Sequence, residues 1–334
     1  MKQALLAEKL REKFRAGETV IGGHVFFTDP EITEMLGYHG FDAIWIDAEH
    51  SAFDLNTILG HIMACASSGC ASLVRVAWND PVRIKPVLEM GPDGIILPMV
   101  CTAEEARQAV RSCTYPLKGV RGFGPRRANQ YGALTNQEYL ANAEKSFLRI
   151  LQIEHKDAIE NLDEILAVEG IDLLICGPND LSASYGHLCD TRNPEMFPIY
   201  DLFAQKCKAA GKPFGVSLGA GDKITMKEWA ARGANFIGCG DDIAYISLGC
   251  QETFRFLKET ESPSNPPYRI FAAHAAGEIF LGGKSHEEDP CSGSGSHAEP
   301  VPRRRSCRKD HHRHPDRSVH RHPRQGNDGV RKVR

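Results

Sequence analysis

Short apolar runs rich in β-branched residues recur along the chain, and segments with helical spacing of apolar positions separate them. The eight clearest runs are 19–27, 41–47, 71–77, 94–100, 147–154, 171–177, 213–218 and 234–240. A weaker run, GVRG (119–122), is a candidate for a further strand. Roughly eight strands alternating with helices are typical of a parallel α/β domain. Closing them into a ring predicts a (β/α)₈ TIM barrel, which needs about 250 residues.

The segments between these runs carry helix start and stop signals. In DPEITEMLGYHG (29–40), Asp29 suits the N-cap, Pro30 the first helical position, and a glycine ends the segment. An open doubly wound sheet would alternate in the same way. The first strand is not followed by GxGxxG, however, so the pattern favours the barrel.

The composition changes near residue 260. The chain carries a net charge of −3, but residues 301–334 contribute +9, which leaves −12 for the first 300 residues. Residues 261–334 contain few apolar side chains and cannot bury enough surface to offset the entropy of ordering. We therefore expect a barrel domain at 1–260 and a disordered tail at 261–334.

Histidine and arginine clusters in this tail could bind transition metals or nucleic acid. No aromatic residue follows Phe280, so the tail offers no stacking platform for single strands. We interpret it as an appendage and expect no nucleic-acid partner.

Overall composition places the chain among globular proteins, with 42% hydrophobic and 25% charged residues. It has no run of about 18 apolar residues to predict a membrane helix, and its N-terminus does not resemble a signal peptide. The 11 cysteines include no CxxC pair, which favours reduced thiols over a zinc or redox site. These features predict a cytoplasmic protein with no membrane partner.

Polar side chains gather where predicted strands end. Alternate residues of a barrel strand face inward, so Asp47 in FDAIWID (41–47) would point into the barrel mouth. The residues expected at this edge are Asp47, His50, Arg75, Gln152, Glu154, Asn179 and Asp180. Each alone has a plainer interpretation, such as a helix cap, a loop hydrogen bond or a structural ion pair. Together they lie at the edge where barrel enzymes place their active sites.

The chemistry suggested by these side chains is specific. Glu154 and Asp180 form a hard oxygen site suited to Mg²⁺ or Mn²⁺. Such a metal can chelate a 2-oxo acid and polarise its carbonyl group. Arg75 would stabilise the developing oxygen charge, and His50, oriented by Asp47, would move a proton. These roles suit carbon–carbon bond cleavage or formation through a pyruvate enolate.

Five motifs also carry a family resemblance: IDAEHSAFD, RVAWND, GVRGFGPRRANQYG, QIEH and GPNDLSASYG. In this order the chain resembles the class II pyruvate aldolases of the HpcH/HpaI family from residue 1 to about 258. The resemblance implies a modified TIM barrel and a Mg²⁺, Mn²⁺ or Co²⁺ cofactor. It also implies a homo-oligomer, usually a hexamer, in which the last helix, including QETFRFLKE (251–259), is exchanged between subunits.

The resemblance implies a role for each residue of the predicted site. Glu154 and Asp180 hold the metal, Arg75 binds the keto oxygen, and His50 is the acid/base with Asp47 as its partner. Gln152 lies near metal and substrate, and backbone N–H groups around Asn179 and Asp180 receive the pyruvate carboxylate. We also expect Leu218, at the end of the seventh strand, to contact substrate.

One feature departs from the family pattern, and one loop has two alternative interpretations. Some members carry a pocket-shaping tryptophan in the first strand, where this chain has His24. The loop with Arg121, Arg126 and Arg127 is interpreted either as a solvated or subunit-contact loop or as a recognition site for an acidic acceptor.

Three functional hypotheses follow. The first is a metal-dependent aldolase that cleaves a 4-hydroxy-2-oxo acid to pyruvate and an aldehyde through a metal-bound enolate. The second is a 2-oxo acid decarboxylase or another C–C lyase on the same scaffold, which product analysis would distinguish. The third is a non-catalytic protein that binds a partner through its tail, which deletion of residues 262–334 would test.

Overall fold

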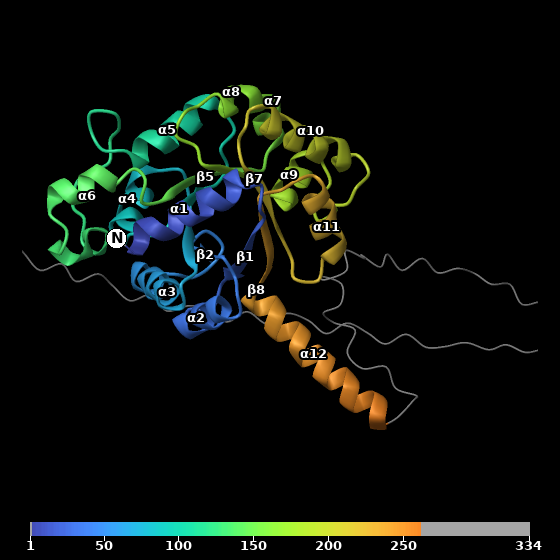
Figure 1. The fold of residues 1–334 in the computed structure, drawn as a ribbon. Helices are drawn as coiled ribbons and strands as arrows, with labels where there is room; N and C mark the ends of the chain where they lie inside the picture. The colour runs from blue at the N-terminus through green and yellow to red at the C-terminus, as the bar shows by residue number, and fades with distance from the viewer. Residues whose placement is uncertain (1, 262–334) are drawn as a thin grey trace, which may run out of the picture. The chain divides into compact units, whose positions relative to one another are not determined.

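Eight parallel strands close into a barrel in the order β1 to β8 (Figure 1), as the sequence predicts. The computed structural model describes residues 2–261, with side chains described for residues 6–258. Apart from residue 261, the predicted tail therefore lies outside the described residues. The strands are β1 (Val20–Val25), β2 (Ala43–Asp47), β3 (Ala71–Arg75), β4 (Gly94–Leu97), β5 (Leu148–Ile153), β6 (Leu173–Cys176), β7 (Phe214–Leu218) and β8 (Phe236–Asp241).

Helices alternate with these strands along the chain, and α12, which follows β8, extends away from them (Figure 1). Asp29 accepts a hydrogen bond from the N–H of Glu31 at the start of α2, as expected of an N-cap. The helices are α1 (Lys2–Arg15), α2 (Pro30–Tyr38), α3 (Leu55–Ser68), α4 (Pro81–Glu89), α5 (Ala103–Cys113), α6 (Asn136–Asn142), α7 (Lys156–Glu160), α8 (Leu162–Leu166), α9 (Pro178–Ser184), α10 (Met196–Ala209), α11 (Lys223–Ala231) and α12 (Asp242–Glu261), with a 3₁₀ helix η1 at Arg127–Gly132.

An apolar cluster fills the inside of the barrel and is separate from the larger cluster between strands and helices. Inward-facing Trp45 and Phe236 belong to the inner cluster. Leu10 and Phe14 of α1 join the same cluster, together with residues at the first positions of several strands. Helix α1 therefore closes the N-terminal end of the barrel and leaves polar side chains to the opposite end.

The candidate strand at 119–122 is wrong, because this segment is a loop. The N–H groups of Val120 and Arg121 bond to the carbonyls of Arg111 and Thr114 at the end of α5. A Cβ atom on Gly119 would lie 2.1 Å from the Thr114 carbonyl oxygen, so the backbone approaches α5 too closely for any other residue. The segment folds back on α5 instead of pairing with a strand.

Helix α12 begins directly after β8. The buried carboxylate of Asp242 accepts hydrogen bonds from the backbone N–H groups of Phe26 and Phe27, each at 2.9 Å, which ties the helix start to the end of β1. Further along the helix, Phe254 and Phe256 are exposed by 63% and 67%. The helix therefore has a fixed start and a partly apolar exposed surface.

Candidate active site

Asp47 and Arg75 stand opposite each other at the C-terminal ends of β2 and β3. Arg75 Nη2 forms an ion pair with Asp47 Oδ2, and its Nε donates to Oδ1 at 3.3 Å. Asp47 is fully buried and Arg75 is 7% exposed. Burial alone would raise the pKa of Asp47, but the Arg75 guanidinium and nearby backbone N–H groups hold it below its ordinary value. Asp47 is therefore a permanent anion that fixes the arginine.

Three further groups hold the Arg75 guanidinium. Its Nη1 lies 2.9 Å from Glu49 Oε2 and 3.3 Å from Gln152 Oε1. The guanidinium also stacks on the Trp45 ring, with its carbon 5.1 Å from the ring centroid. The ion pair with Glu49 was not anticipated from the sequence, because Glu49 lies in a loop where strand alternation predicts no direction. Arg75 therefore has a preset orientation, as a donor to developing negative charge requires.

Glu154 lies directly beyond Gln152 and is 3% exposed. Gln152 Nε2 donates to Glu154 Oε2, and the backbone N–H of Met99 donates to Oε1 at 2.8 Å. Burial raises the pKa of Glu154 to about 7, the Met99 N–H opposes this effect, and the charges of Glu49 and Asp180 add to it. The site therefore holds a buried carboxylate whose charge a cation would stabilise.

Gly177 lies just after β6 and makes room for this carboxylate. A Cβ atom here would come within 2.6 Å of Glu154 Oε2 and 2.9 Å of Gln152 Nε2. Only glycine leaves both side chains in their observed places.

The loop that contains His50 is held by Asp47 through its backbone. Asp47 Oδ1 accepts from the N–H groups of Glu49 and His50 at 2.9 and 3.0 Å. The His50 side chain is 62% exposed, and its Nε2 lies 3.8 Å from Glu49 Oε2. Asp47 therefore positions the His50 backbone, and the imidazole ring stays accessible to water and substrate.

The remaining predicted residues lie at the same end of the barrel. Asn179 and Asp180 are exposed in the first turn of α9, and the Asp180 charge raises the pKa of both Glu49 and Glu154. Leu218 ends β7, and its side chain packs in the apolar cluster between strands and helices. The side chains of Asn179 and Asp180 are therefore accessible to solvent, whereas the Leu218 side chain is buried between strands and helices.

His24 is a second histidine at this site and is 6% exposed. Its ring centroid lies 4.6 Å from that of Trp45, and its Nε2 is 3.1 Å from Ser217 Oγ. Burial lowers the pKa of His24 to about 4, so the ring is neutral at ordinary pH.

Strand alternation could have indicated Ser217, because it alternates with the outward-facing Val216 and Leu218. No feature of the sequence indicates that the Met99 N–H donates to Glu154.

The donor set fits a hard divalent cation. The charge of Asp180 acts on both Glu49 and Glu154, Glu49 acts on Glu154, and the Arg75 guanidinium opposes these effects at both glutamates. Within residues 2–261, no group of three or more His, Cys, Asp or Glu side chains is arranged to hold a metal ion. The expected site has only two such ligands, Glu154 and Asp180, and would leave other positions to water and substrate oxygens.

In the same part of the chain, no helix is both long and apolar enough to cross a membrane.

Comparison with known proteins agrees with this geometry. The chain is 36% identical to a 5-keto-4-deoxy-D-glucarate aldolase from Salmonella arizonae over 254 residues, which cover 75% of this chain and 97% of the relative. The structure resembles the HpcH/HpaI aldolase from Desulfitobacterium hafniense DCB-2 with a TM-score of 0.70 and 28% identity, covering 77% of this chain and 98% of that one. It also resembles the citrate synthase SbnG with a TM-score of 0.67 and 26% identity, covering 75% and 98%.

The pattern of the HpcH/HpaI aldolase/citrate lyase family matches residues 23–247, which include every residue of the site described above. The chain therefore belongs to the HpcH/HpaI aldolase/citrate lyase family and is a carbon–carbon lyase of the pyruvate aldolase type.

Proposed function

We propose that this protein is a divalent-metal-dependent aldolase that cleaves a 4-hydroxy-2-oxo acid to pyruvate and an aldehyde. The observation that carries the proposal is the position of Arg75, whose guanidinium is held by Asp47, Glu49 and Gln152 beside the Glu154 carboxylate. A fixed cation next to a pair of metal-binding carboxylates suits a 2-oxo acid, whose keto oxygen gains negative charge during the reaction.

In the cleavage direction the C3–C4 bond breaks and its electron pair enters the C2–C3 bond. A Mg²⁺, Mn²⁺ or Co²⁺ ion held by Glu154 and Asp180 would supply Lewis-acid polarisation of the 2-oxo group. Arg75 donates to the C2 oxygen as its charge grows. His50, directly or through water, accepts the proton of the C4 hydroxyl group, so that C4 leaves as an aldehyde. C3 then takes up a proton, either the one that His50 accepted or one from water, and pyruvate is released.

The substrate carboxylate would lie over the start of α9. The backbone N–H groups of Asn179 and Asp180 are in its first turn, where an anion is stabilised by unpaired amide donors. Pro178 precedes them and has no N–H to donate. This placement supports a role for the loop after β6 in binding the carboxylate end of pyruvate.

The similarity to a 5-keto-4-deoxy-D-glucarate aldolase makes a keto-deoxy sugar acid the first substrate to test. His24 and Ser217 would face the aldehyde half of such a substrate from the β1 and β7 side of the barrel mouth. Their polar atoms suit an aldehyde that carries hydroxyl or carboxylate groups.

The test is proton exchange at the methyl group of pyruvate, followed by NMR in D₂O. Metal-stripped protein should leave the methyl signal unchanged, and added Mg²⁺, Mn²⁺ or Co²⁺ should make it decay. His50→Ala should slow the decay, whereas His39→Ala, an exposed histidine at the end of α2, should behave as the unmodified protein. Absence of exchange with every metal, in protein shown to be folded, would reject the proposal.

Product analysis separates this reaction from decarboxylation on the same scaffold. An aldolase forms pyruvate and an aldehyde in equal amounts from a keto-deoxy sugar acid. A decarboxylase given oxaloacetate releases CO₂ and forms no aldehyde. If CO₂ release dominates, the protein is a 2-oxo acid decarboxylase and the aldolase proposal is wrong.

We also propose that the protein is a homo-oligomer, a hexamer in its family's usual form, with α12 packed on a neighbouring subunit. The exposed phenyl rings of Phe254 and Phe256 support this assembly. Sedimentation of the full chain should give a mass several times that of one chain, and the double change to Phe254→Ser and Phe256→Ser should lower it. A monomeric full chain would contradict the proposal.

A further inference from the structure

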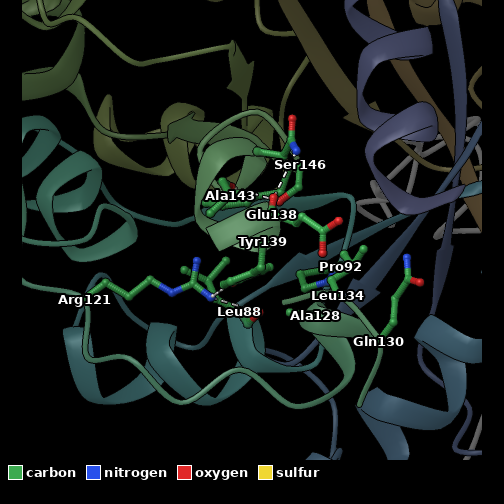
Figure 2. Close-up of a pocket in the computed structure, with 13 residues that line it drawn as sticks. Leu88, Pro92, Arg121, Ala128, Gln130, Leu134, Glu138, Tyr139, Ala143 and Ser146 are labelled. Atoms are coloured by element: carbon green, nitrogen blue, oxygen red, sulfur yellow. Dashed lines mark hydrogen bonds between the residues drawn. The ribbon is translucent and has the colours of Figure 1, made fainter. Parts of the chain in front are cut away.

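A cavity of about 310 Å³ lies away from the active site, at the N-terminal end of β4 and β5 (Figure 2). Leu88 and Pro92 line it from the α4 side, and Tyr139 of α6 lines it from the excursion between α5 and β5. Phe147, directly before β5, also borders the cavity. The catalytic side chains stand at the C-terminal ends of the strands, so this cavity is a separate space with a largely apolar wall.

Arg121 reaches this wall with a guanidinium that is almost entirely buried. The side chain is only 2% exposed, and in Figure 2 it extends towards Leu88 and Tyr139. Its Nη2 donates to the Tyr139 hydroxyl oxygen at 3.0 Å and to the Leu88 carbonyl oxygen at 3.3 Å. The guanidinium carbon also lies 4.5 Å from the centroid of the Tyr115 ring. The solvated-loop interpretation of this arginine is therefore wrong.

The hydrogen bonding of Arg121 is incomplete. Its Nε is buried and has no hydrogen-bond partner among the described residues. Among the described side chains, Glu89 pairs with Arg121 at 3.4 Å from Nη2, a long contact for an ion pair, and Glu89 Oε2 is itself buried without a hydrogen-bond partner among them. A buried donor without an acceptor destabilises the folded chain, and more strongly when the group is charged. An acceptor brought by a ligand would remove this cost.

The charge around the cavity favours an anion. Arg126 and Lys85 act electrostatically on Glu89, together with Arg121. Arg127 binds the carbonyl oxygens of Met90 and Gly91 on the same turn after α4. Of these four cations Arg121 lines the cavity itself, and the nearby acids are Glu89, Glu138 and Asp93, the last of which faces Arg127.

One wall of the cavity is held in a strained backbone conformation. Gln130 lines the cavity with a φ of 57°, and the next residue, Tyr131, has the same value, although neither is glycine. Consecutive non-glycine residues with positive φ are strained, and such residues often mark ligand-binding segments.

We propose that this cavity binds a small organic acid with an apolar body, such as an aromatic carboxylate. The carboxylate accepts from Arg121, and the apolar body fills the space between Leu88, Leu134 and Phe147. The size of the cavity, at the lower end of the range for small-molecule sites, limits the ligand to a compact molecule. This inference does not rest on the proposed reaction, because none of its residues belongs to the active site.

The test uses benzoate as the probe, titrated into the full-length protein by isothermal titration calorimetry. Acetate offers the charge without the apolar body, and benzyl alcohol offers the ring without the charge. Benzoate should bind saturably at one site per chain and more tightly than either. Equal binding of benzyl alcohol would overturn the acid part of the proposal, and no saturable binding of benzoate would overturn it entirely.

Variants locate the bound probe. Ala128→Leu fills the cavity, and Ala133→Leu makes the same change on an exposed residue of the same segment that does not line it. Ala128→Leu should weaken benzoate binding at least about tenfold because the larger side chain occupies the cavity. Arg121→Gln should weaken it at least about tenfold because it removes a charged hydrogen bond. Circular dichroism checks folding, and Ala128→Leu keeps the test valid if Arg121→Gln does not fold.

Two outcomes would show that the probe binds elsewhere. Unchanged affinity in Ala128→Leu would exclude the cavity. Loss of binding in Arg75→Ala would place benzoate at the catalytic mouth instead. A benzoate affinity equal to that of the unmodified protein in both Ala133→Leu and Arg75→Ala supports the proposed site.

Discussion

Arg75 and Asp47 form a paired contact across two neighbouring strands, with Arg75 Nε 3.3 Å from Asp47 Oδ1 and Nη2 paired with Oδ2. The same carboxylate oxygen, Oδ1, accepts from the backbone of the His50 loop. One buried carboxylate therefore positions both Arg75, the proposed donor to the keto oxygen, and the loop that carries His50, the proposed acid/base. This arrangement depends on the planar shape of the guanidinium as much as on its charge.

Arg75→Lys should therefore recover little activity. A lysine keeps the charge but cannot contact both oxygens of Asp47 while it also reaches Glu49 and Gln152. We expect kcat/KM to fall by at least about a hundredfold, since loss of one preorganised donor has an effect of this size. Steady-state kinetics with pyruvate formation as the readout checks this. Arg83→Lys, on the exposed side of α4, is the matched control, and near-normal turnover in Arg75→Lys would mean that only a charge is needed.

Gly177→Ala should disturb the site without unfolding the barrel. The added methyl group would lie 2.6 Å from Glu154 Oε2, which forces the carboxylate or the strand end to move. We expect a tenfold or greater loss of kcat/KM, of the order seen when catalytic groups are misplaced by about 1 Å. Gly60→Ala in α3 is the control, because its nearest neighbour would be at an ordinary 3.6 Å. Equal activity in both variants would show that Glu154 tolerates displacement.

Strand alternation explains why most of the site could be predicted from the sequence. Asp47, Arg75 and Gln152 lie at strand ends, where a two-residue period decides which side chains face the barrel mouth. The same rule gives no direction for Glu49, which lies in a loop and turns out to pair with Arg75. It also gives no warning that GVRG (119–122) folds against α5, because that contact depends on a close backbone approach at Gly119. Contacts between distant loops, such as the Met99 N–H with Glu154, follow only from the folded chain.

Glu154→Gln should weaken metal binding while the barrel stays folded. The amide is nearly the same size, and its oxygen can still accept from the Met99 N–H. Its NH₂ group loses the hydrogen bond from Gln152 Nε2, and it lacks the negative charge that a divalent cation requires. We expect the affinity for Mn²⁺ to fall by about tenfold or more, measured by calorimetry on metal-stripped protein. Glu160→Gln, an exposed residue at the end of α7, should bind Mn²⁺ as the unmodified protein does. Unchanged affinity in Glu154→Gln would remove Glu154 from the ligand set.

Asp93→Asn should change how stability depends on pH. Asp93 is 2% exposed, accepts two hydrogen bonds from Ser72 through Oδ2, and burial raises its pKa from 3.8 to about 7. The folded state therefore binds the proton more tightly than the unfolded state. The contribution of this proton to stability is fully present below about pH 4 and is lost as the pH rises towards 7. Asparagine keeps an oxygen for Ser72 and has no charge to bury.

The melting temperature of Asp93→Asn relative to the unmodified protein should thus rise from pH 5 to pH 8. One pKa unit corresponds to about 1.4 kcal/mol, and 1 kcal/mol shifts the melting temperature of a domain of this size by about 2–4 °C, so a difference of several degrees is expected. Asp163→Asn, whose side chain is 76% exposed, should follow the unmodified protein across this range. Parallel melting curves for Asp93→Asn and the unmodified protein at every pH would mean that Asp93 is ionised in the folded state, with Arg127 compensating its charge.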